Sequence, residues 1–391
     1  MYYPRKIYDD LVAHLDKRSI TLLTGMRRTG KTTLVKRLLE ERGDRNSIYL
    51  DLERIDNRLL FGEKNYDNIL IALSGRGLDI NKKMTIAIDE MQLMPEITSV
   101  IKYLYDQYHI KFILTGSSSF YLKGLVSDSL AGRKKIFELS PLDFGEFLTF
   151  KGIPHGQPGI NPVFIESEYH RLKGFYEEFI QYGGFPEVVL VDDVKDKSDY
   201  LSDIISSYIN IDVKTLSDFR NISMIQNLIK MLALRCSNRL DITKISILTG
   251  ISRPTVISYI ELFEKSYLVH LLPVFSQNAD REIVKSKKVY FCDTGLLNVF
   301  ANPGSGTTFE NALFLQLKPL GNLNYYSLKT GNEIDFILEN DAYEAKETPA
   351  IYDLEKLKKT ASRINLRNYF VVGKFPPANP FNEFLWGGNI L

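Results

Sequence analysis

The stretch GMRRTGKT, residues 25–32, decides the fold that the sequence predicts. It fits the pattern G-x-x-x-x-G-K-[ST], a glycine-rich loop whose backbone N–H groups surround phosphate groups together with the positive end of the following helix. The flanking sequence agrees, because residues 20–24 form a short β-rich run and residues 31–42 have helical spacing. We therefore expect a strand, a phosphate-binding loop and a helix in succession; an ordinary glycine-rich turn is the alternative.

The pattern also gives individual residues a role. Lys31 is expected to reach the β- and γ-phosphates of a nucleotide and to serve catalysis there, and the Thr32 hydroxyl is expected to ligate Mg²⁺. The nucleotide-binding residues predicted in and beside the loop are Gly25, Met26, Arg27, Arg28, Thr29, Gly30, Lys31, Thr32 and Thr33.

Two carboxylates follow an apolar strand-like run at residues 85–88. Asp89 and Glu90 would lie at the carboxyl end of that strand, where open parallel sheets bind their ligands. Asp89 suits the Mg²⁺ shell, and Glu90 can orient or deprotonate an attacking water. A strand that simply reaches solvent is the common alternative, but the phosphate loop favours the functional interpretation.

Two further segments are candidates for sensing or stabilising the γ-phosphate. The strand-like run 111–114 leads into hydroxyl side chains, of which Thr115 and Ser117 can hydrogen-bond to phosphate; a serine-rich turn is the alternative. Arg133 can stabilise the charge that develops on phosphate, from its own chain or from a neighbouring subunit. A solvated arginine in a basic run is the alternative there.

Composition limits the class of protein. At about 150 residues per domain, the 391 residues predict two to three domains. With 44% hydrophobic residues and a formal net charge of +1, disorder is excluded and no global field draws the chain to nucleic acid or lipid. The apolar runs are too short for a membrane span, and Cys236 and Cys292 lack zinc or disulfide spacing. We expect a cytoplasmic protein.

Changes in periodicity along the chain predict four modules. Alternating strands and helices in residues 1–148 predict an α/β domain with a parallel, doubly wound sheet. Residues 149–220 turn helical, as a lid, and residues 221–288 have the pattern of a winged helix-turn-helix. From residue 289 to 391, β-rich runs return and predict a second α/β domain.

The winged-helix interpretation depends on two short helical patterns, residues 242–248 and about 252–262, joined by a turn at Gly250. The runs 267–272 and 281–288 would form the wing, whose lysines would contact phosphate. The side chains expected on the exposed face of the second helix are Arg253, Thr255 and Ser258. Such modules also act as structural adaptors, which is the alternative.

The C-terminal region places two acids and a lysine on neighbouring strands. Residues 332–338 and 342–346 are strand-like, and a tight turn at Asn340-Asp341 would join them as a hairpin. In that register Asp335 lies opposite Lys346, and Glu344 points to the same face as Lys346.

Two acids and a lysine are the side chains that Mg²⁺-dependent phosphodiester hydrolysis uses. Asp335 and Glu344 would hold the metal ion, Lys346 would position or activate water, and Glu310 would complete the ligand set. The alternative is a cross-strand salt bridge from Asp335 to Lys346, with Glu344 in solvent.

The chain resembles the predicted AAA+ superfamily ATPases of bacteria and archaea, a group close to the STAND signalling NTPases. The matching stretches are LLTGMRRTGKTTL, TIAIDE, FILTGSSS, LAGRKKIFELSPLDFGEFL and YGGFPEVVL. The resemblance implies ATP as the nucleotide, and it implies that the lid segment 184–186, with Pro186, packs near the base; a helix-ending turn is the alternative.

The C-terminal region resembles the PD-(D/E)XK restriction-endonuclease-like domain that follows these ATPases, including YFCDTG at residues 290–295. Ile334 replaces the proline of the nominal motif. Together the resemblances imply a Mg²⁺-dependent ATPase whose nucleotide state controls a winged-helix and nuclease-like half acting on DNA. A nucleotide-controlled switch that binds a partner without cutting is the second hypothesis, and a transcription regulator is the third. The expected partners are ATP or ADP, DNA and a second copy of the chain, with no membrane.

Overall fold

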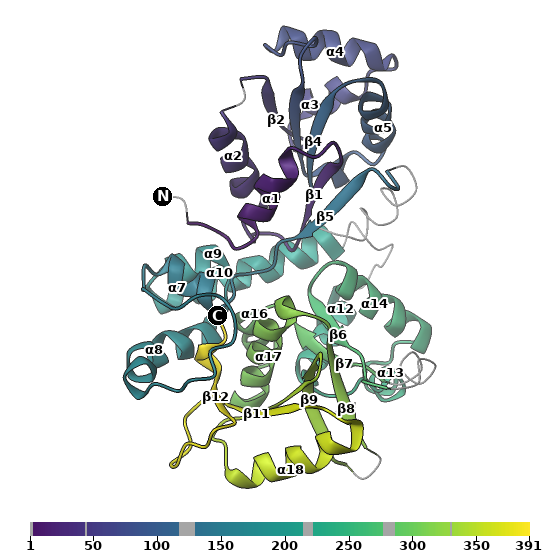
Figure 1. Cartoon of the computed structure of the whole chain (residues 1–391). Helices are drawn as coiled ribbons and strands as arrows, with labels where there is room; N and C mark the ends of the chain where they lie inside the picture. The colour runs from purple at the N-terminus through teal and green to yellow at the C-terminus, as the bar shows by residue number, and fades with distance from the viewer. Residues whose placement is uncertain (1–2, 44, 117–129, 214–221, 277–285, 329–330) are drawn as a thin grey trace.

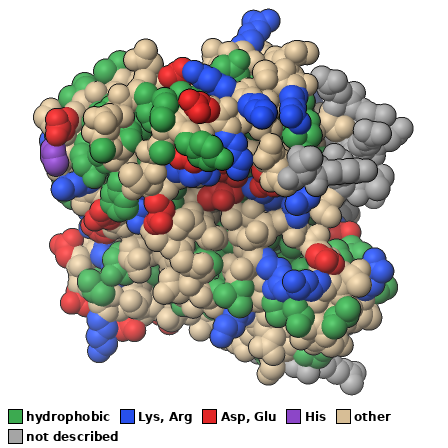
Figure 2. All heavy atoms as spheres, turned by 90° about the horizontal axis from the view of Figure 1, so that it is seen from below, with side chains coloured by type: hydrophobic (Ala, Val, Ile, Leu, Met, Phe, Trp, Pro, Cys, Tyr) green, Lys and Arg blue, Asp and Glu red, His purple; other side chains and the backbone are tan. Residues whose placement is uncertain are grey.

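The computed structural model describes residues 3–43, 45–116, 130–213, 222–276, 286–328 and 331–391. Figure 1 shows the N-terminal sheet at the top and the C-terminal sheet at the bottom, with helices of the middle segment between them. The charged side chains of both signs are interspersed over the face in Figure 2, as the near-zero net charge predicts. No helix in these ranges is both long and apolar enough to cross a membrane.

The N-terminal sheet confirms the predicted parallel α/β fold. Its strands are β1 (Ile20–Thr24), β2 (Ser47–Asp51), β3 (Met84–Asp89), β4 (Ile110–Gly116) and β5 (Lys134–Glu138). They lie in the order β2-β3-β4-β1-β5, and all four pairings are parallel. The carboxyl ends of β1, β3 and β4 therefore meet at one edge, and the loop that follows β1 lies beside the residues that end β3 and β4.

Helices cover both faces of this sheet (Figure 1). The helices are α1 (Tyr8–Leu15), α2 (Lys31–Arg42), α3 (Ile55–Phe61), α4 (Tyr66–Gly75) and α5 (Ile97–Gln107), and a 3-10 turn, η1 (Met91–Leu93), follows β3. Leu11 of α1 and Leu34 of α2 belong to one buried cluster, whereas Leu60, Ile69 and Ile101 of α3, α4 and α5 belong to another. These two clusters are the two layers of apolar core that a doubly wound sheet requires.

The chain then turns helical, as the sequence predicts. The segment contains α7 (Phe144–Phe150), α8 (Glu166–Tyr182), α9 (Pro186–Leu190), α10 (Val194–Ser207) and a π-helical turn, η2 (Tyr208–Val213). The next segment contains α12 (Ile222–Ala233), α13 (Ile242–Thr249), α14 (Arg253–Lys265) and the antiparallel pair β6 (Val269–Leu272) and β7 (Lys288–Phe291). Strand β7 crosses the predicted module boundary after residue 288.

The turn between α13 and α14 has the predicted local chemistry. Gly250 ends α13 in the left-handed conformation, with φ of 70°. The Ser252 side chain accepts a hydrogen bond from Thr255 N and so caps α14, and Pro254 stands in the first turn of that helix, where its missing N–H costs nothing. The two short helices are therefore joined by three residues.

The C-terminal domain is a mixed sheet between helices. Its elements are α16 (Thr294–Phe300), α17 (Ser305–Leu317), η3 (Lys318–Leu320), β8 (Leu323–Ser327), β9 (Glu333–Leu338), β10 (Asp341–Lys346), α18 (Ile351–Ala361), η4 (Ser362–Ile364), β11 (Asn368–Gly373), β12 (Phe384–Trp386) and η5 (Gly387–Asn389). The strand order is β12-β11-β10-β9-β8. Leu354 of α18 packs in a buried cluster with Ile337, whereas Phe309 of α17 packs in a different cluster with Phe336, so the helices cover opposite faces.

The predicted hairpin register is wrong by two residues. Asp341 begins β10 and pairs with Leu338, so the turn consists of residues 339–340, and Glu339 adopts a φ of 55°. The pairing continues to Tyr343 opposite Phe336, which places Asp335 next to the position of Glu344, not opposite Lys346. The prediction assumed that Asp341 belonged to the turn.

A β-bulge sets the direction of the side chains in β9. Asn324 pairs with Ile337 but Tyr326 pairs with Ile334, so two steps along β8 match three along β9. Ile334 and Ile337 both pack in the cluster with α18, although residues three apart in a regular strand point to opposite faces. The bulge therefore lies at residues 335–336 and takes Asp335 out of the regular alternation.

A buried histidine gives this fold a testable dependence on pH. The ring nitrogens of His14 lie 2.8 Å from Thr21 Oγ1 and 2.9 Å from Ser19 Oγ. Burial, with the nearby charge of Lys111, lowers the pKa of His14 from 6.5 to about 4. Because the unfolded chain binds a proton at a pH where native His14 does not, this contribution to stability is present above pH 6.5 and lost as the pH falls toward 4.

We predict that replacing His14 with Gln removes about 2 kcal/mol of the fall in unfolding free energy between about pH 7 and about pH 5. Urea unfolding at both pH values measures the difference. The control is His170→Gln, because His170 is exposed. Equal pH dependence in wild type and His14→Gln would contradict the assignment.

Candidate nucleotide-binding site and acidic cluster

A cleft of about 540 Å³ lies between the phosphate-binding loop and the helical segment. Its size is within the range of small-molecule sites. It is lined by Tyr3, Arg5, Arg27, Arg28, Thr29, Gly30, Lys31, Thr32, Thr33, Leu34, Glu90, Phe150, Pro186, Glu187, Leu190, Ser207 and Ile211. Seven consecutive residues of the predicted binding loop, 27–33, therefore face one cleft with Pro186 of the lid.

The loop needs glycine at its first position. Gly25 has a φ of 146°, and a Cβ atom there would lie 2.2 Å from the carbonyl oxygen of Leu139. Lys31 is buried, and its Nζ donates to the carbonyl oxygens of Gly25 and Met26, at 2.8 Å each. The ammonium group thus lies inside the curve of the loop, which is the position from which it can meet phosphate oxygens.

The ends of β3 and β4 bring oxygen ligands to the start of α2. Thr32 Oγ1 donates to Asp89 Oδ2 at 2.7 Å, and the hydroxyl of Tyr49 donates to the same oxygen at 2.5 Å. Thr115 Oγ1 donates to the other oxygen, Oδ1. A hydroxyl and a carboxylate side by side, next to a phosphate-binding loop, are suitable ligands for Mg²⁺. Tyr49 was not foreseen, because nothing in its local sequence links it to Asp89.

Glu90 lies at the mouth of this site in a constrained conformation. Its φ is 56°, and Arg27 Nη2 lies 3.8 Å from its Oε2. Burial raises the pKa of Glu90, whereas the charges of Arg27 and Lys31 oppose the rise. A carboxyl group whose pKa is raised toward neutrality suits proton transfer from water.

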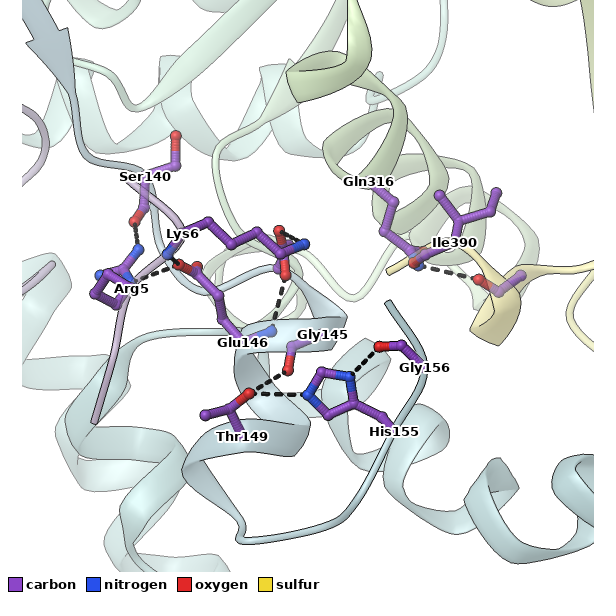
Figure 3. Close-up of polar contacts among 12 residues, drawn as sticks. Arg5, Lys6, Ser140, Gly145, Glu146, Thr149, His155, Gly156, Gln316 and Ile390 are labelled. Carbon is purple, nitrogen blue, oxygen red and sulfur yellow. Dashed lines mark hydrogen bonds and ion pairs between the residues drawn. The ribbon is translucent and has the colours of Figure 1, made fainter. Parts of the chain in front are cut away.

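A buried arginine attaches the N-terminal segment to the loop. Arg5 donates from Nε to Glu146 Oε1 at 2.9 Å and from Nη2 to the carbonyl oxygen of Ser140 at 2.8 Å (Figure 3). From Nη1 it donates to the carbonyl oxygen of Thr29 at 2.9 Å. Removing one member of such a buried pair typically costs about 3–5 kcal/mol. Arg5 therefore fixes the loop relative to α7, the helix that carries Glu146.

The lid segment approaches the loop through glycine and proline. Gly183 ends α8, and a Cβ atom on Gly184 would lie 2.0 Å from the carbonyl oxygen of Leu142, so Gly184 has a packing requirement. Pro186 begins α9 and lines the cleft, and Glu187 lies 3.8 Å from Arg28. The helix-ending turn is thus present, and packing of Pro186 near the nucleotide base stays a prediction.

Arg133 and Ser117 are not placed with the other predicted residues of the nucleotide site. Arg133 precedes β5 at the amino end of β1, where its carbonyl accepts from Ile20 N, and its guanidinium pairs with Asp106 at 2.9 Å. Because the loop follows the opposite end of β1, Arg133 does not serve the site of its own chain; a role across a subunit interface stays a prediction. Ser117 lies outside the described residues.

In the C-terminal half, a buried lysine occupies the centre of an acidic cluster. Lys288 Nζ lies 3.3 Å from Glu310 Oε1 and 3.4 Å from Asp335 Oδ1, and it also contacts Glu333. Burial alone would lower the pKa of Lys288, but the three carboxylates outweigh it and raise the pKa. The prediction that Lys288 contacts phosphate as part of a wing is therefore wrong, because its side chain is 3% exposed.

Glu344 and Lys346 lie beside this cluster. Lys346 Nζ is 2.8 Å from Glu344 Oε1, and Ala345 N donates to Asp335 Oδ2 at 3.0 Å. Glu344 is buried, and burial together with Asp335 raises its pKa to about 8. The structure thus brings Asp335, Glu344 and Lys346 together, but the lysine pairs with Glu344 and not with Asp335.

The cluster as described does not fit a metal ion. Among the described residues, no group of three or more His, Cys, Asp or Glu side chains is arranged to hold one. Within the same ranges, Glu344 Oε2 is buried without a hydrogen-bond partner. Lys288 supplies the positive charge that a metal would otherwise bring.

Helix α14 leaves two of its three predicted contact residues exposed. Arg253 and Ser258 are exposed and Thr255 is half-buried, and Lys287 before β7 is exposed. Arg281 and Lys285, the other predicted wing cations, lie outside the described residues. Of the basic residues predicted to contact DNA, Arg253 and Lys287 are the exposed ones within the described ranges.

Sequence comparison gives the chain its relatives. It is 30% identical over 377 residues to the uncharacterized protein MJ1544 of Methanocaldococcus jannaschii, with 92% of this chain and 82% of that protein covered. The chain belongs to the family of MJ1544. An uncharacterized Haemophilus influenzae protein is also similar, at 25% identity over 344 residues, with 84% of this chain and 81% of that protein covered.

In this chain, residues 17–148 match the model of an AAA domain. Residues 174–305 match a domain of unknown function, DUF8612. A solved structure, the Walker-type ATPase paby2304 of Pyrococcus abyssi, is similar at 17% identity and a TM-score of 0.47, covering 76% of this chain and 96% of that one. The AAA match confirms the resemblance to P-loop AAA+ ATPases for the N-terminal domain. The winged-helix and nuclease-like assignments stay predictions.

Proposed function

We propose that the chain is a Mg²⁺-dependent ATP hydrolase whose nucleotide state controls a C-terminal half that acts on DNA. The observation that carries the hydrolase is that Lys31, Thr32 and Glu90 line one cleft, with Asp89 bonded to Thr32. Thr32 Oγ1 lies 2.7 Å from Asp89 Oδ2, and Glu90 follows Asp89 directly. These are the groups that phosphoryl transfer to water requires.

Each residue has a step to perform. Backbone N–H groups of the loop bind the phosphates, and Lys31 moves from the carbonyl oxygens of Gly25 and Met26 to the β- and γ-phosphate oxygens. When bound through Thr32 and Asp89, Mg²⁺ supplies positive charge against the phosphate oxygens. Glu90 then orients a water molecule toward the γ-phosphorus and accepts its proton, while Thr115 fixes Asp89.

Arg27 gives Glu90 a resting partner. The 3.8 Å pair between Arg27 and Glu90 lies in the cleft where phosphate would bind. Phosphate oxygens compete for the guanidinium of Arg27, since bidentate phosphate contacts are favourable for arginine. Nucleotide binding therefore releases the carboxylate for catalysis.

We predict that Lys31→Ala abolishes nucleotide binding and that Glu90→Gln keeps binding but lowers the rate of ATP hydrolysis by about 100-fold or more. Binding of a fluorescent ATP analogue and phosphate release measure the two effects. Exposed Lys64→Ala and Glu63→Gln are charge-matched controls. Full hydrolysis in Glu90→Gln would remove Glu90 from the mechanism.

The proposed action on DNA is supported by two features of the C-terminal half. Helices α13 and α14 with the β6–β7 pair have the element order of a winged helix, and Arg253 is exposed at the start of the second helix. Asp335, Glu344 and Lys346 lie together on β9 and β10, and they are the residues that the restriction-endonuclease-like resemblance names.

A specific observation favours the second candidate, a switch that does not cut. Lys288 pairs with Glu310, Glu333 and Asp335, and its ammonium group occupies the position between them that a cation would take. In that case the C-terminal half binds a partner or DNA, and the acidic cluster has a structural role.

Plasmid cleavage separates the two candidates. With Mg²⁺ and ATP, a nuclease is expected to nick plasmid DNA, to lose this activity in Asp335→Ala and Lys346→Ala, and to keep it in Glu355→Gln, a substitution at an exposed site. No nicking by a wild-type protein that hydrolyses ATP would establish the switch. Loss of DNA retention in Arg253→Ala, with or without nicking, would place the DNA contact on α14.

A further inference from the structure

The segment CDTG, residues 292–295, lies where the phosphate-binding loop, the lid and the C-terminal half meet. It connects β7 to α16, and all four of its residues are buried. Cys292 Sγ lies 3.5 Å from Sδ of Met26, a residue of the loop. Neither the proposed hydrolysis of ATP nor the proposed action on DNA uses Asp293, the next residue, although its carboxylate reaches the lid.

Asp293 makes two kinds of contact with its carboxylate. Oδ1 accepts a hydrogen bond from Leu296 N at 3.0 Å and so caps α16, whereas Oδ2 accepts one from Gly184 N of the lid at 2.7 Å. Burial raises the pKa of Asp293 to about 6, and the N–H groups that it accepts from oppose the rise. Hydrogen bonds to an ionised acceptor are stronger than neutral ones, so the bond to Gly184 is a firm attachment.

Gly184 is held from both sides. Its N–H donates to Asp293 of the C-terminal half, and its carbonyl oxygen accepts from Leu142 N, before α7, at 2.7 Å. The segments approach at backbone distance, because a Cβ atom on Gly295 would lie 2.1 Å from the carbonyl oxygen of Tyr182. The lid is therefore joined to the N-terminal domain and to the C-terminal half at one residue.

Helix α16 also caps the helix that leads into this joint. Thr294 Oγ1 donates to the carbonyl oxygen of Phe179 at 3.0 Å. Asn298 Nδ2 donates to the carbonyl oxygens of Ile180 and Gln181, at 3.2 and 2.9 Å. These carbonyl groups belong to the last turn of α8, where intrahelical donors run out. The C-terminal half thus fixes the end of α8 as well as the residue that follows it.

The position of Gly184 decides where the lid meets the cleft. Pro186 begins α9 two residues later, and the intervening Phe185 is fully buried. Pro186, Glu187 and Leu190 of this short helix line the cleft. A displacement of Gly184 would therefore move the wall that α9 contributes.

The cleft offers different surfaces to the two parts of a nucleotide. Backbone N–H groups and Lys31 of the loop suit the phosphates. Apolar and aromatic side chains from outside the loop complete the cleft, and these are Tyr3, Phe150, Pro186, Leu190 and Ile211. Such side chains suit a sugar and a flat base, and they offer nothing to phosphate oxygens.

We propose that Asp293 is a positioning residue for the nucleoside part of ATP: by holding Gly184, it places the lid wall of the cleft against the sugar and base. This inference rests on the proposed nucleotide site. It adds that the C-terminal half, from which Asp293 comes, contributes to the affinity for the nucleoside and not to the affinity for the phosphates.

The test replaces Asp293 with Ser in the full chain. Serine caps a helix as well as aspartate does, so α16 keeps its cap, but the shorter side chain does not reach Gly184 N. Calorimetry measures binding of a non-hydrolysable ATP analogue and of inorganic tripolyphosphate, which lacks the nucleoside. We expect the Kd of the analogue to rise about tenfold, as for one lost hydrogen bond to a charged group, and the Kd of tripolyphosphate to stay the same.

Hydrolysis gives a second measurement on the same variant. The KM for ATP should rise by a similar factor while kcat stays unchanged, because Lys31 and Glu90 keep their positions and the lost contact acts on binding alone. Lys31→Ala should instead weaken binding of both the analogue and tripolyphosphate. Asp241→Ser is the matched control, since Asp241 caps α13 by accepting from Lys244 N and does not contact the lid; both affinities should stay at the wild-type values.

Asp293→Asn serves if Asp293→Ser does not fold. It keeps the size of the side chain, but its amide group turns a donor toward Gly184 N or Leu296 N, so the same selective loss of analogue binding is expected. In a folded variant, unchanged analogue binding overturns the proposal, and so does an equal loss for the analogue and tripolyphosphate.

The wild type separates this inference from the proposed function. A wild type that binds tripolyphosphate as tightly as the analogue would leave the phosphate site in place and overturn the positioning role, because the nucleoside would then contribute nothing. A wild type that binds neither the analogue nor tripolyphosphate would refute the proposed nucleotide site, and the role of Asp293 with it.

Discussion

The contact between the phosphate-binding loop and the end of β7 is the constraint on which the account of this protein depends. Met26 lies inside the loop, and Cys292 belongs to the C-terminal half, yet their sulfur atoms are 3.5 Å apart and buried. A buried contact of this kind is part of a close-packed interior. The phosphate-binding loop and the C-terminal half therefore share core packing, although 266 residues separate the two contacting side chains.

The two groups of acids in the molecule are in different electrostatic states. Asp89 receives hydrogen bonds from the hydroxyls of Thr32, Tyr49 and Thr115, which keep it oriented beside an open cleft. Glu310 and Asp335 instead share the buried ammonium group of Lys288. The first carboxylate would hold the Mg²⁺ of the proposed hydrolase, whereas the second pair already has an internal cation as its partner.

The sequence predicted best those functional residues that lie close together in the chain. The loop at residues 25–32 and the acids after β3 follow local patterns, and a parallel sheet brings the ends of its strands to one edge. From these facts the parallel fold could be predicted, and so could residues 27–33 and Glu90, which line the cleft. The cleft residues of the N-terminal segment and of the helical segment, such as Tyr3 and Ile211, could not. The lid contact of Pro186 needed the resemblance, since a turn explains Gly183-Gly184 equally well.

What could not be predicted depends on contacts between distant segments. The ion pair between Arg5 and Glu146 joins residues that are far apart in the sequence, so no local pattern indicates it. Lys288 was assigned to a wing because it lies in a basic run, and such runs are usually solvated. The bulge in β9 and the residues in its turn decide where Asp335 points, and neither leaves a signal in the alternation of residue types. The spacing of residue types indicates which face of a regular strand or helix a side chain occupies. A bulge and a turn are irregular, so spacing does not indicate where their side chains point.

The central claim is that a nucleotide binds in the cleft beside the phosphate-binding loop. Hydrogen–deuterium exchange of the backbone amides of residues 27–33, with and without a non-hydrolysable ATP analogue and Mg²⁺, tests it most directly. The account predicts that the analogue slows the exchange of these amides in wild type and leaves it unchanged in Lys31→Ala. Identical exchange in wild type with and without saturating analogue would contradict it.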